Sequence, residues 1–197
     1  MTLETYDNFY VIKNVLTDSQ INTLIDWWNN QDYLLDTDGE PNVKYSNTWD
    51  TELDKKQKIE AYNRVVDIIG LPRNTFAWLD TIYSNIFATV HGSSLELEYP
   101  SYFTKYSTGG FHDIHNDIVD DVWPNRKWIC TMQLSDTSDY VGGDLQVHKY
   151  IDDTMSSYDY MTAPRDKGCA IIYNPRAIHS IAEVTSGTRY TIVECAG

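Results

Sequence analysis

The sequence predicts an α+β fold, in which an antiparallel barrel or sandwich of strands carries helices packed on one side. Three observations indicate this class. Apolar residues recur at helical spacing in two stretches of the first half of the chain. Short apolar runs separated by Gly, Pro, Asp and Ser turns follow from residue 95 onward. The 197 residues suit one domain with a sizeable core, so we expect a single domain over residues 1–197.

The first half begins with a strand and a capped helix. Residues 8–13 (NFYVIK) predict a short strand. Thr17 and Gln20 have the spacing of a capping box, in which each side chain bonds the backbone of the other residue. A helix of about three turns is expected after them, because apolar residues recur there at helical spacing. The polar, Asp- and Asn-rich residues 31–52 predict a loop.

Residues 53–70 and the stretch after them complete this half. A helix could form over 53–70, although β-branched residues weaken that expectation. Pro72 ends whatever precedes it. A clear helical stripe follows and ends near Gly92. The residues of this stripe are Leu79, Ile82, Tyr83, Ile86, Phe87 and Val90. Residues 1–94 therefore supply a strand and supporting helices.

Short β-runs fill residues 95–197, which we expect to form the core of the barrel. The tract 148–162 is rich in Tyr and Asp and predicts a mobile loop between strands. The predicted strands lie within residues 95–106, 127–134, 144–150, 169–174, 179–184 and 188–195.

The composition excludes several functional classes. The net charge is −14 and no basic stripe is present, which argues against a nucleic-acid partner. The first ten residues carry acids and no apolar core, so we expect no signal peptide, and no run reaches membrane-spanning length. Cys130, Cys169 and Cys195 lie in apolar β-like runs, which indicates buried thiols in a reducing compartment. A soluble, cytoplasmic protein is expected.

Two histidines and an aspartate form the strongest candidate site. His115 and Asp117 are two residues apart, so on an extended strand both side chains point to one face. His179 would have to reach the same site from a distant strand. Two imidazoles and one carboxylate can bind one face of an octahedral Fe(II) and leave the other positions open. Arg189, ten residues after His179, would supply a charged fork for a carboxylate on a small co-substrate.

Three other histidines are not expected to bind the metal. His112 is an odd number of residues from His115, so on a regular strand it faces the other way, unless an irregular backbone near Gly110 reverses it. His148 should alternate outward from the core face and lie at the surface or face the substrate. His91 ends an apolar helix, where a histidine needs no chemical role.

The motifs around these residues resemble those of one enzyme superfamily. They are, in order, Tyr106-x-x-Gly109, His115-x-Asp117, the run from Arg126-Lys to Gln-Leu-Ser, Tyr140-x-Gly-Gly-x-Leu, His179 and Arg189-Tyr-Thr191. With these motifs, segment 99–195 resembles the catalytic domain of the 2-oxoglutarate and Fe(II)-dependent oxygenases. It is most similar to the prolyl 4-hydroxylase-like branch and its PKHD-type hydroxylases. The resemblance implies a double-stranded β-helix (jelly-roll) barrel as the catalytic core, with the N-terminal helices packed on one side.

The resemblance also implies the cofactors and the roles of the site residues. Fe(II) would be held by His115, Asp117 and His179. The distal carboxylate of 2-oxoglutarate would pair with Arg189, and Tyr106 and Thr191 could add hydrogen bonds to it. O2 would complete the reactants, and ascorbate would support turnover. A carboxylate at residue 117 favours hydroxylation, because related halogenases have a small residue there and bind halide in its place.

The resemblance implies a substrate as well. A dioxygenase of this branch would hydroxylate an unactivated C–H bond, here of a prolyl residue in a peptide or protein. Aromatic side chains could line a groove for such a peptide, or be ordinary core and rim residues. The aromatic residues in question are Trp123, Trp128, Tyr150, Tyr158 and Tyr160. The substrate-contact candidates are Trp123, Arg126, Trp128 and His148.

Two alternatives remain open. One is a 2-oxoglutarate-dependent hydroxylase of a free amino acid or another small molecule. The other is a non-catalytic, metal-binding, cupin-like barrel, against which Arg189 argues. Nucleic-acid demethylases of the superfamily usually carry a second arginine six residues after the one that matches Arg189. Cys195 occupies that position here, which together with the acidic composition counts against that branch.

Overall fold

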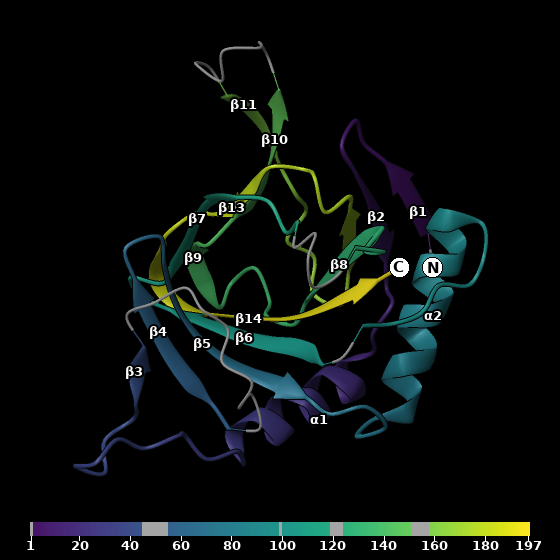
Figure 1. Ribbon diagram of the computed structural model, residues 1–197. Helices are drawn as coiled ribbons and strands as arrows, with labels where there is room; N and C mark the ends of the chain where they lie inside the picture. The colour runs from purple at the N-terminus through teal and green to yellow at the C-terminus, as the bar shows by residue number, and fades with distance from the viewer. Residues whose placement is uncertain (1, 45–54, 99, 119–123, 151–157) are drawn as a thin grey trace.

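The computed structural model describes residues 2–44, 55–98, 100–118, 124–150 and 158–197 (Figure 1). These residues form a mostly antiparallel sheet that curls into an open barrel, with two helices on one side, which confirms the predicted α+β fold. No helix in this part of the chain has the length and apolar character needed to cross a bilayer. The elements are β1 Thr2–Thr5, β2 Phe9–Lys13, α1 Asp18–Asn29, β3 Val43–Lys44, β4 Gln57–Ala61, β5 Arg64–Leu71, α2 Ala77–His91, β6 Ser101–Ser107, β7 Phe111–His115, β8 Trp128–Gln133, β9 Tyr140–Gly142, β10 Leu145–Tyr150, β11 Tyr158–Thr162, β12 Ala170–Tyr173, β13 His179–Ile181 and β14 Val184–Ala196.

The strand order shows how the two halves of the chain combine. Along the sheet it is β1-β2-β12-β8-β14-β6-β5-β7-β13-β10-β11, with β3 and β4 extending from β5 and β9 paired to β14. β2 lies beside β12, and β5 lies between β6 and β7. The barrel therefore extends beyond residues 95–197, because it also takes strands from the first half.

The helical alternative for residues 53–70 is wrong. These residues contain β4 and most of β5, which pair antiparallel from Gln57–Ile68 to Ala61–Arg64. The physical reason is that β5 has both faces covered. Ile68 packs in the barrel interior, and the next residue, Ile69, packs in the cluster formed with the helices. β-Branched side chains suit a pleated surface that is buried on two sides, and this packing outweighs any helical tendency.

The two helices match the sequence prediction and build the outer core. Both hydrogen bonds of the capping box are present: the Gln20 N–H donates to the Thr17 hydroxyl, and the Thr17 N–H donates to the Gln20 side chain. Gly92 caps the C-terminus of α2, and its φ of +83° is the left-handed conformation that favours glycine. Trp28 of α1 packs on Phe103 of β6 with ring centroids 4.9 Å apart. The helices therefore cover the outer face of the sheet and leave the interior for a site (Figure 1).

The predicted loop over residues 148–162 is wrong where the structure describes this tract. β10 and β11 pair antiparallel in register from Gln146–Thr162 to Tyr150–Tyr158, and they form the hairpin that projects from the barrel in Figure 1. Residues 151–157 lie outside the described residues. The Tyr, Met and Thr residues of β11 suit a strand pair, and the polar composition of the tract hid this pattern. The three cysteines are buried and free, as expected.

Candidate metal centre

The strand pair β7–β13 brings the two predicted histidine ligands together. His115 and His179 stand directly opposite each other in this antiparallel pair. The turn into β7 depends on glycines: Gly109 has φ +82°, and a Cβ on Gly110 would lie 2.7 Å from the Ser107 carbonyl oxygen. Asp117 follows the end of β7 and is held there by its N–H, which donates to the Pro175 carbonyl at 3.0 Å.

The three side chains converge on one point. One ligand atom from each of His115, Asp117 and His179 lies within 4.8 Å of the others. The Asp117 Oδ1 is 3.6 Å from His115 Nε2, and its Oδ2 is 3.3 Å from His179 Nε2. Two imidazoles and one carboxylate at such separations suit three positions around a non-haem Fe(II). The residues present therefore fit the iron that the sequence predicts.

Backbone carbonyls orient both imidazoles. The Nδ1 of His115 lies 2.7 Å from the Asp113 carbonyl oxygen, and the Nδ1 of His179 lies 3.0 Å from the Ala177 carbonyl oxygen. A carbonyl only accepts, so each Nδ1 donates a proton in these bonds, and each Nε2 faces the Asp117 carboxylate. Such hydrogen bonds fix ring orientation and tautomer in metal sites.

Burial and mutual charge set the protonation of the three groups. Burial, with His179 as the next cause, lowers the pKa of His115 to about 4, so this imidazole is neutral near pH 7. Burial alone would raise the pKa of Asp117, but the two imidazoles outweigh it and hold that pKa below its usual value. Burial likewise opposes charge on His179, yet Asp117 raises its pKa. The site therefore presents an ionised carboxylate between two imidazoles.

His112 does not face away from the site. β7 has one extra residue relative to β13 between the pairs His115–His179 and His112–Ile181, which is a β-bulge. The bulge reverses the alternation, so the His112 ring stacks on His115 with centroids 3.7 Å apart and planes at 22°. The bulge lies within β7, between His112 and His115, and so follows Gly110 by about three residues. His112 is not among the convergent ligand atoms, in agreement with its interpretation as a non-ligand.

Arg189 is the second feature of the interior. Its side chain is fully buried (0% exposed), and within the described residues none of its three guanidinium nitrogens has a hydrogen-bond partner. Its Cζ lies 5.5 Å from the centre of the Tyr106 ring. Tyr106 is close enough to both Arg189 and Asp117 for their charges to act on its pKa, which burial raises. A buried guanidinium without hydrogen-bond partners is favourable only when an anion completes it, and a carboxylate matches its fork.

Other polar side chains share the interior with Arg189. Thr191 lies two residues further along the same face of β14, and its hydroxyl is 2.5 Å from that of Thr104. Gln133 stands opposite Thr191 on β8, and its buried Oε1 has no hydrogen-bond partner within the described residues. Sequence reasoning missed Thr104 and Gln133. Strand alternation was the available signal, because Gln133 is in phase with the inward-facing Ile129.

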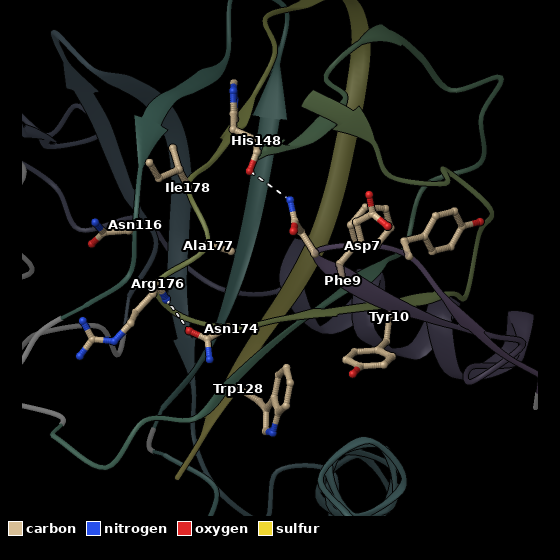
Figure 2. Close-up of a pocket in the computed structure, with 12 residues that line it drawn as sticks. Asp7, Phe9, Tyr10, Asn116, Trp128, His148, Asn174, Arg176, Ala177 and Ile178 are labelled. Atoms are coloured by element: carbon tan, nitrogen blue, oxygen red, sulfur yellow. Dashed lines mark hydrogen bonds between the residues drawn. The ribbon is translucent and has the colours of Figure 1, made fainter. Parts of the chain in front are cut away.

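A cavity of about 540 Å³ is lined in part by residues that flank the predicted metal ligands in sequence (Figure 2). Asn116 and Ile178, neighbours of the ligands in sequence, form one side of it, and the N-terminal segment 6–10 forms the other. Trp128 and Tyr10 meet edge to face, with centroids 5.7 Å apart, on the lining of the same cavity. The remaining lining residues are His148, Asn174, Arg176 and Ala177.

The four substrate candidates fall in different places. Trp128 and His148 line the cavity, although His148 is buried and hydrogen-bonded to Ser180 rather than lying at the surface. Arg126 is bound elsewhere, to Glu98 and to the Asp117 carbonyl. Trp123 lies outside the described residues. Among the other aromatic candidates, Tyr160 is 47% exposed with its ring 5.6 Å from His148, and the side chains of Tyr150 and Tyr158 are outside the described set. His91 ends α2 and accepts from Trp128 Nε1 at 3.3 Å.

Comparison with known proteins agrees with this geometry. The model of the 2OG-Fe(II) oxygenase superfamily matches residues 101–194. Residues 101–194 are a 2OG-Fe(II) oxygenase domain. This oxygenase domain contains His115, Asp117, His179 and Arg189. A "PKHD-type hydroxylase" from Prochlorococcus marinus is 30% identical over 142 residues, which are 72% of this chain and 56% of that protein. The chain therefore spans little more than half the length of this curated relative.

Solved structures share the fold of the oxygenase domain and its N-terminal elements. A Pseudomonas putida prolyl-4-hydroxylase matches with a TM-score of 0.63 and 12% identity, over 96% of this chain and 91% of that one. The α-ketoglutarate-dependent epimerase SnoN from nogalamycin biosynthesis matches with a TM-score of 0.68 and 13% identity, over 97% and 78%. At these identities the likeness establishes the jelly-roll fold that the sequence predicts.

Proposed function

We propose that the protein is an Fe(II)- and 2-oxoglutarate-dependent dioxygenase that hydroxylates an unactivated C–H bond of a prolyl residue in a peptide or protein. The observation that carries this proposal is Arg189. A fully buried guanidinium without a hydrogen-bond partner in the described residues is costly unless an anionic ligand completes it. The family match makes 2-oxoglutarate the anion that fits.

Each site residue then has a role that follows from its position. His115, Asp117 and His179 would hold the metal through Nε2, a carboxylate oxygen and Nε2. Fe(II), 2-oxoglutarate and O2 together supply the oxidising power that converts C–H to C–OH, with 2-oxoglutarate leaving as succinate and CO2, and ascorbate keeps the iron reduced. Arg189 would orient the co-substrate through its distal carboxylate, assisted by Tyr106 and Thr191. The buried surroundings of Arg189 exclude the water that would weaken this ion pair.

The cavity of about 540 Å³ supports a peptide substrate. Trp128 and Tyr10 present aromatic surfaces, and proline-containing segments pack well on such surfaces. Asn116 and Asn174 add amide groups that can bond an extended backbone. The name of the 30% identical relative, a PKHD-type hydroxylase, agrees with hydroxylation.

A free amino acid or another small molecule is the alternative substrate. The structures that share this fold include a prolyl hydroxylase and an epimerase of nogalamycin biosynthesis, so the fold does not select between the two classes. A non-catalytic cupin-like barrel would have no need for the buried charge of Arg189.

The test separates these three functions. Purified protein receives Fe(II), ascorbate and 2-oxoglutarate with proline-rich peptides or with free amino acids, and His115→Ala serves as the inactive control. We expect peptide-dependent succinate and a peptide heavier by one oxygen atom in the mass spectrum. Oxidation of free amino acids alone would replace the peptide proposal. No succinate above the control with any substrate would contradict the oxygenase proposal.

A further inference from the structure

Arg126 is fully engaged by two neighbours, and one of them is a metal-ligand residue. Its Nη1 donates to the backbone carbonyl of Asp117 at 2.9 Å. Its Nε and Nη2 donate to the carboxylate of Glu98, the shortest contact being 2.6 Å. The side chains of Arg126 and Glu98 are only 10% and 12% exposed. A forked ion pair shielded in this way keeps a more fixed geometry than one at the open surface.

Glu98 is itself fixed to the wall of the barrel. Its N–H donates to the Cys195 carbonyl at the end of β14 at 2.8 Å. Its own carbonyl accepts from the Arg73 guanidinium. These bonds fix the main chain of Glu98, and its carboxylate, in a side chain only 12% exposed, is the acceptor that holds the Arg126 fork.

Asp117 needs such support because it lies beyond the strand that carries His115. β7 ends at His115, and Asp117 is two residues further on. Its N–H is held by the Pro175 carbonyl at 3.0 Å, and its carbonyl is held by Arg126. These two bonds fix both peptide groups of Asp117, and the peptide planes in turn set the direction of its side chain.

We infer that Arg126, held by Glu98, is a positioning residue that fixes the Asp117 peptide so that the carboxylate meets the metal. This inference rests on the proposed function, because it assumes that Asp117 is a metal ligand. It replaces the substrate contact expected for Arg126. The guanidinium is directed at Glu98 and Asp117, and Arg126 does not line the cavity. Outer residues that orient ligands typically change metal affinity about 10- to 100-fold when they are mutated.

The experiment is a titration of the full, metal-free chain with Co(II), followed by visible absorption. Arg126→Lys keeps the charge but loses the fork, and Glu98→Gln keeps the shape but loses the charge of the acceptor. Arg165→Lys is the matched control, since Arg165 also donates to a backbone carbonyl, that of Tyr140 at 2.8 Å, and pairs with Asp144. His179→Ala reports on the metal site itself.

We expect Arg126→Lys to raise the Kd for Co(II) at least tenfold and to alter the Co(II) spectrum, because the carboxylate is displaced. Glu98→Gln should also raise the Kd for Co(II). The double variant should bind Co(II) little more weakly than Arg126→Lys alone, because both substitutions act through one contact. Arg165→Lys should stay within about twofold of the wild type. If Arg126→Lys does not fold, Glu98→Gln carries the test.

The outcomes distinguish this inference from the proposed function. Suppose that His179→Ala abolishes Co(II) binding. An unchanged Kd and spectrum in Arg126→Lys then overturn the positioning role. If only Glu98→Gln folds, an unchanged Kd and spectrum in that variant overturn it. An equal loss of affinity in Arg165→Lys also overturns it, because the effect would then be general destabilisation. If His179→Ala binds Co(II) as tightly as the wild type, the metal site and the proposed function fail with it.

Discussion

Replacing Arg189 with Met should change stability and ligand affinity in opposite directions. The substitution keeps an unbranched side chain of similar length and removes the charge. In the ligand-free protein, the Arg189 guanidinium is fully buried and has no hydrogen-bond partner within the described residues. We therefore expect Arg189→Met to be more stable than the wild type in the absence of 2-oxoglutarate, and to bind 2-oxoglutarate far more weakly.

The magnitudes follow from the environment of the side chain. Replacing buried ionic groups with apolar ones of similar volume often stabilises a protein by about 1–4 kcal/mol. The Tyr106 ring, 5.5 Å away, recovers up to about 2 kcal/mol of the cost through a cation–π contact, which lowers the upper figure, so a gain of about 1–2 kcal/mol is expected. Loss of one partner of a buried charge pair weakens binding by about 2–5 kcal/mol, which is about 30-fold to a few thousand-fold in Kd.

Two measurements on the same samples test this prediction. Urea unfolding of the metal-free proteins gives the change in unfolding free energy, and calorimetric titration of the Mn(II)-loaded proteins with 2-oxoglutarate gives the Kd. The affinity for Mn(II) itself should be unchanged, because a guanidinium cation has no lone pair to offer a metal ion. A variant that is less stable than the wild type and binds 2-oxoglutarate equally well would refute the reasoning and make Arg189 a structural residue.

Three further predictions concern other parts of the molecule. Burial raises the pKa of Glu194 from 4.5 to about 7, so its stabilising contribution is present below the lower value and lost as the pH rises through the upper one. Glu194→Gln should flatten the decline in unfolding free energy between pH 4.5 and 7 by up to about 1.4 kcal/mol per pH unit, measured by urea unfolding. Trp128→Ala removes an aromatic side chain from the lining of the cavity, so it should raise the KM for a prolyl peptide about tenfold in a succinate assay. The Kd for 2-oxoglutarate should stay unchanged. An unchanged KM would show that Trp128 does not contact the substrate. Thr17→Ala breaks the capping box of α1 and should lower the unfolding free energy by about 1 kcal/mol without changing the Kd for 2-oxoglutarate. A weaker affinity for 2-oxoglutarate would contradict a purely local role for Thr17.

Local pattern was enough to predict much of the fold. The Thr17–Gln20 spacing and the apolar stripe that ends at Gly92 identify the two helices, because capping and helical periodicity act within a few residues. Strand alternation predicts that His115 and Asp117 share one face; the two do converge, although Asp117 lies beyond the end of β7. Convergence with His179 came from the resemblance and not from any local rule.

What the sequence did not predict depends on contacts between distant segments. Residues 53–70 became strands because β5 is covered on both sides, which only the assembled sheet determines. The bulge in β7 turned His112 onto His115, and strand alternation assumes that no residue is inserted. Arg126 bonds Glu98, 28 residues away, so its partner could not be read from its neighbours in sequence.

The central claim is that the three convergent ligands and Arg189 form one site for iron and 2-oxoglutarate. The most direct test is an anaerobic titration of the protein and Fe(II) with 2-oxoglutarate, followed by the visible charge-transfer band that arises when 2-oxoglutarate chelates the iron. We predict a saturable band in the wild type, none in His179→Ala, and saturation only at much higher 2-oxoglutarate in Arg189→Met. Absence of the band in the wild type, or the same titration curve in Arg189→Met, would contradict the claim.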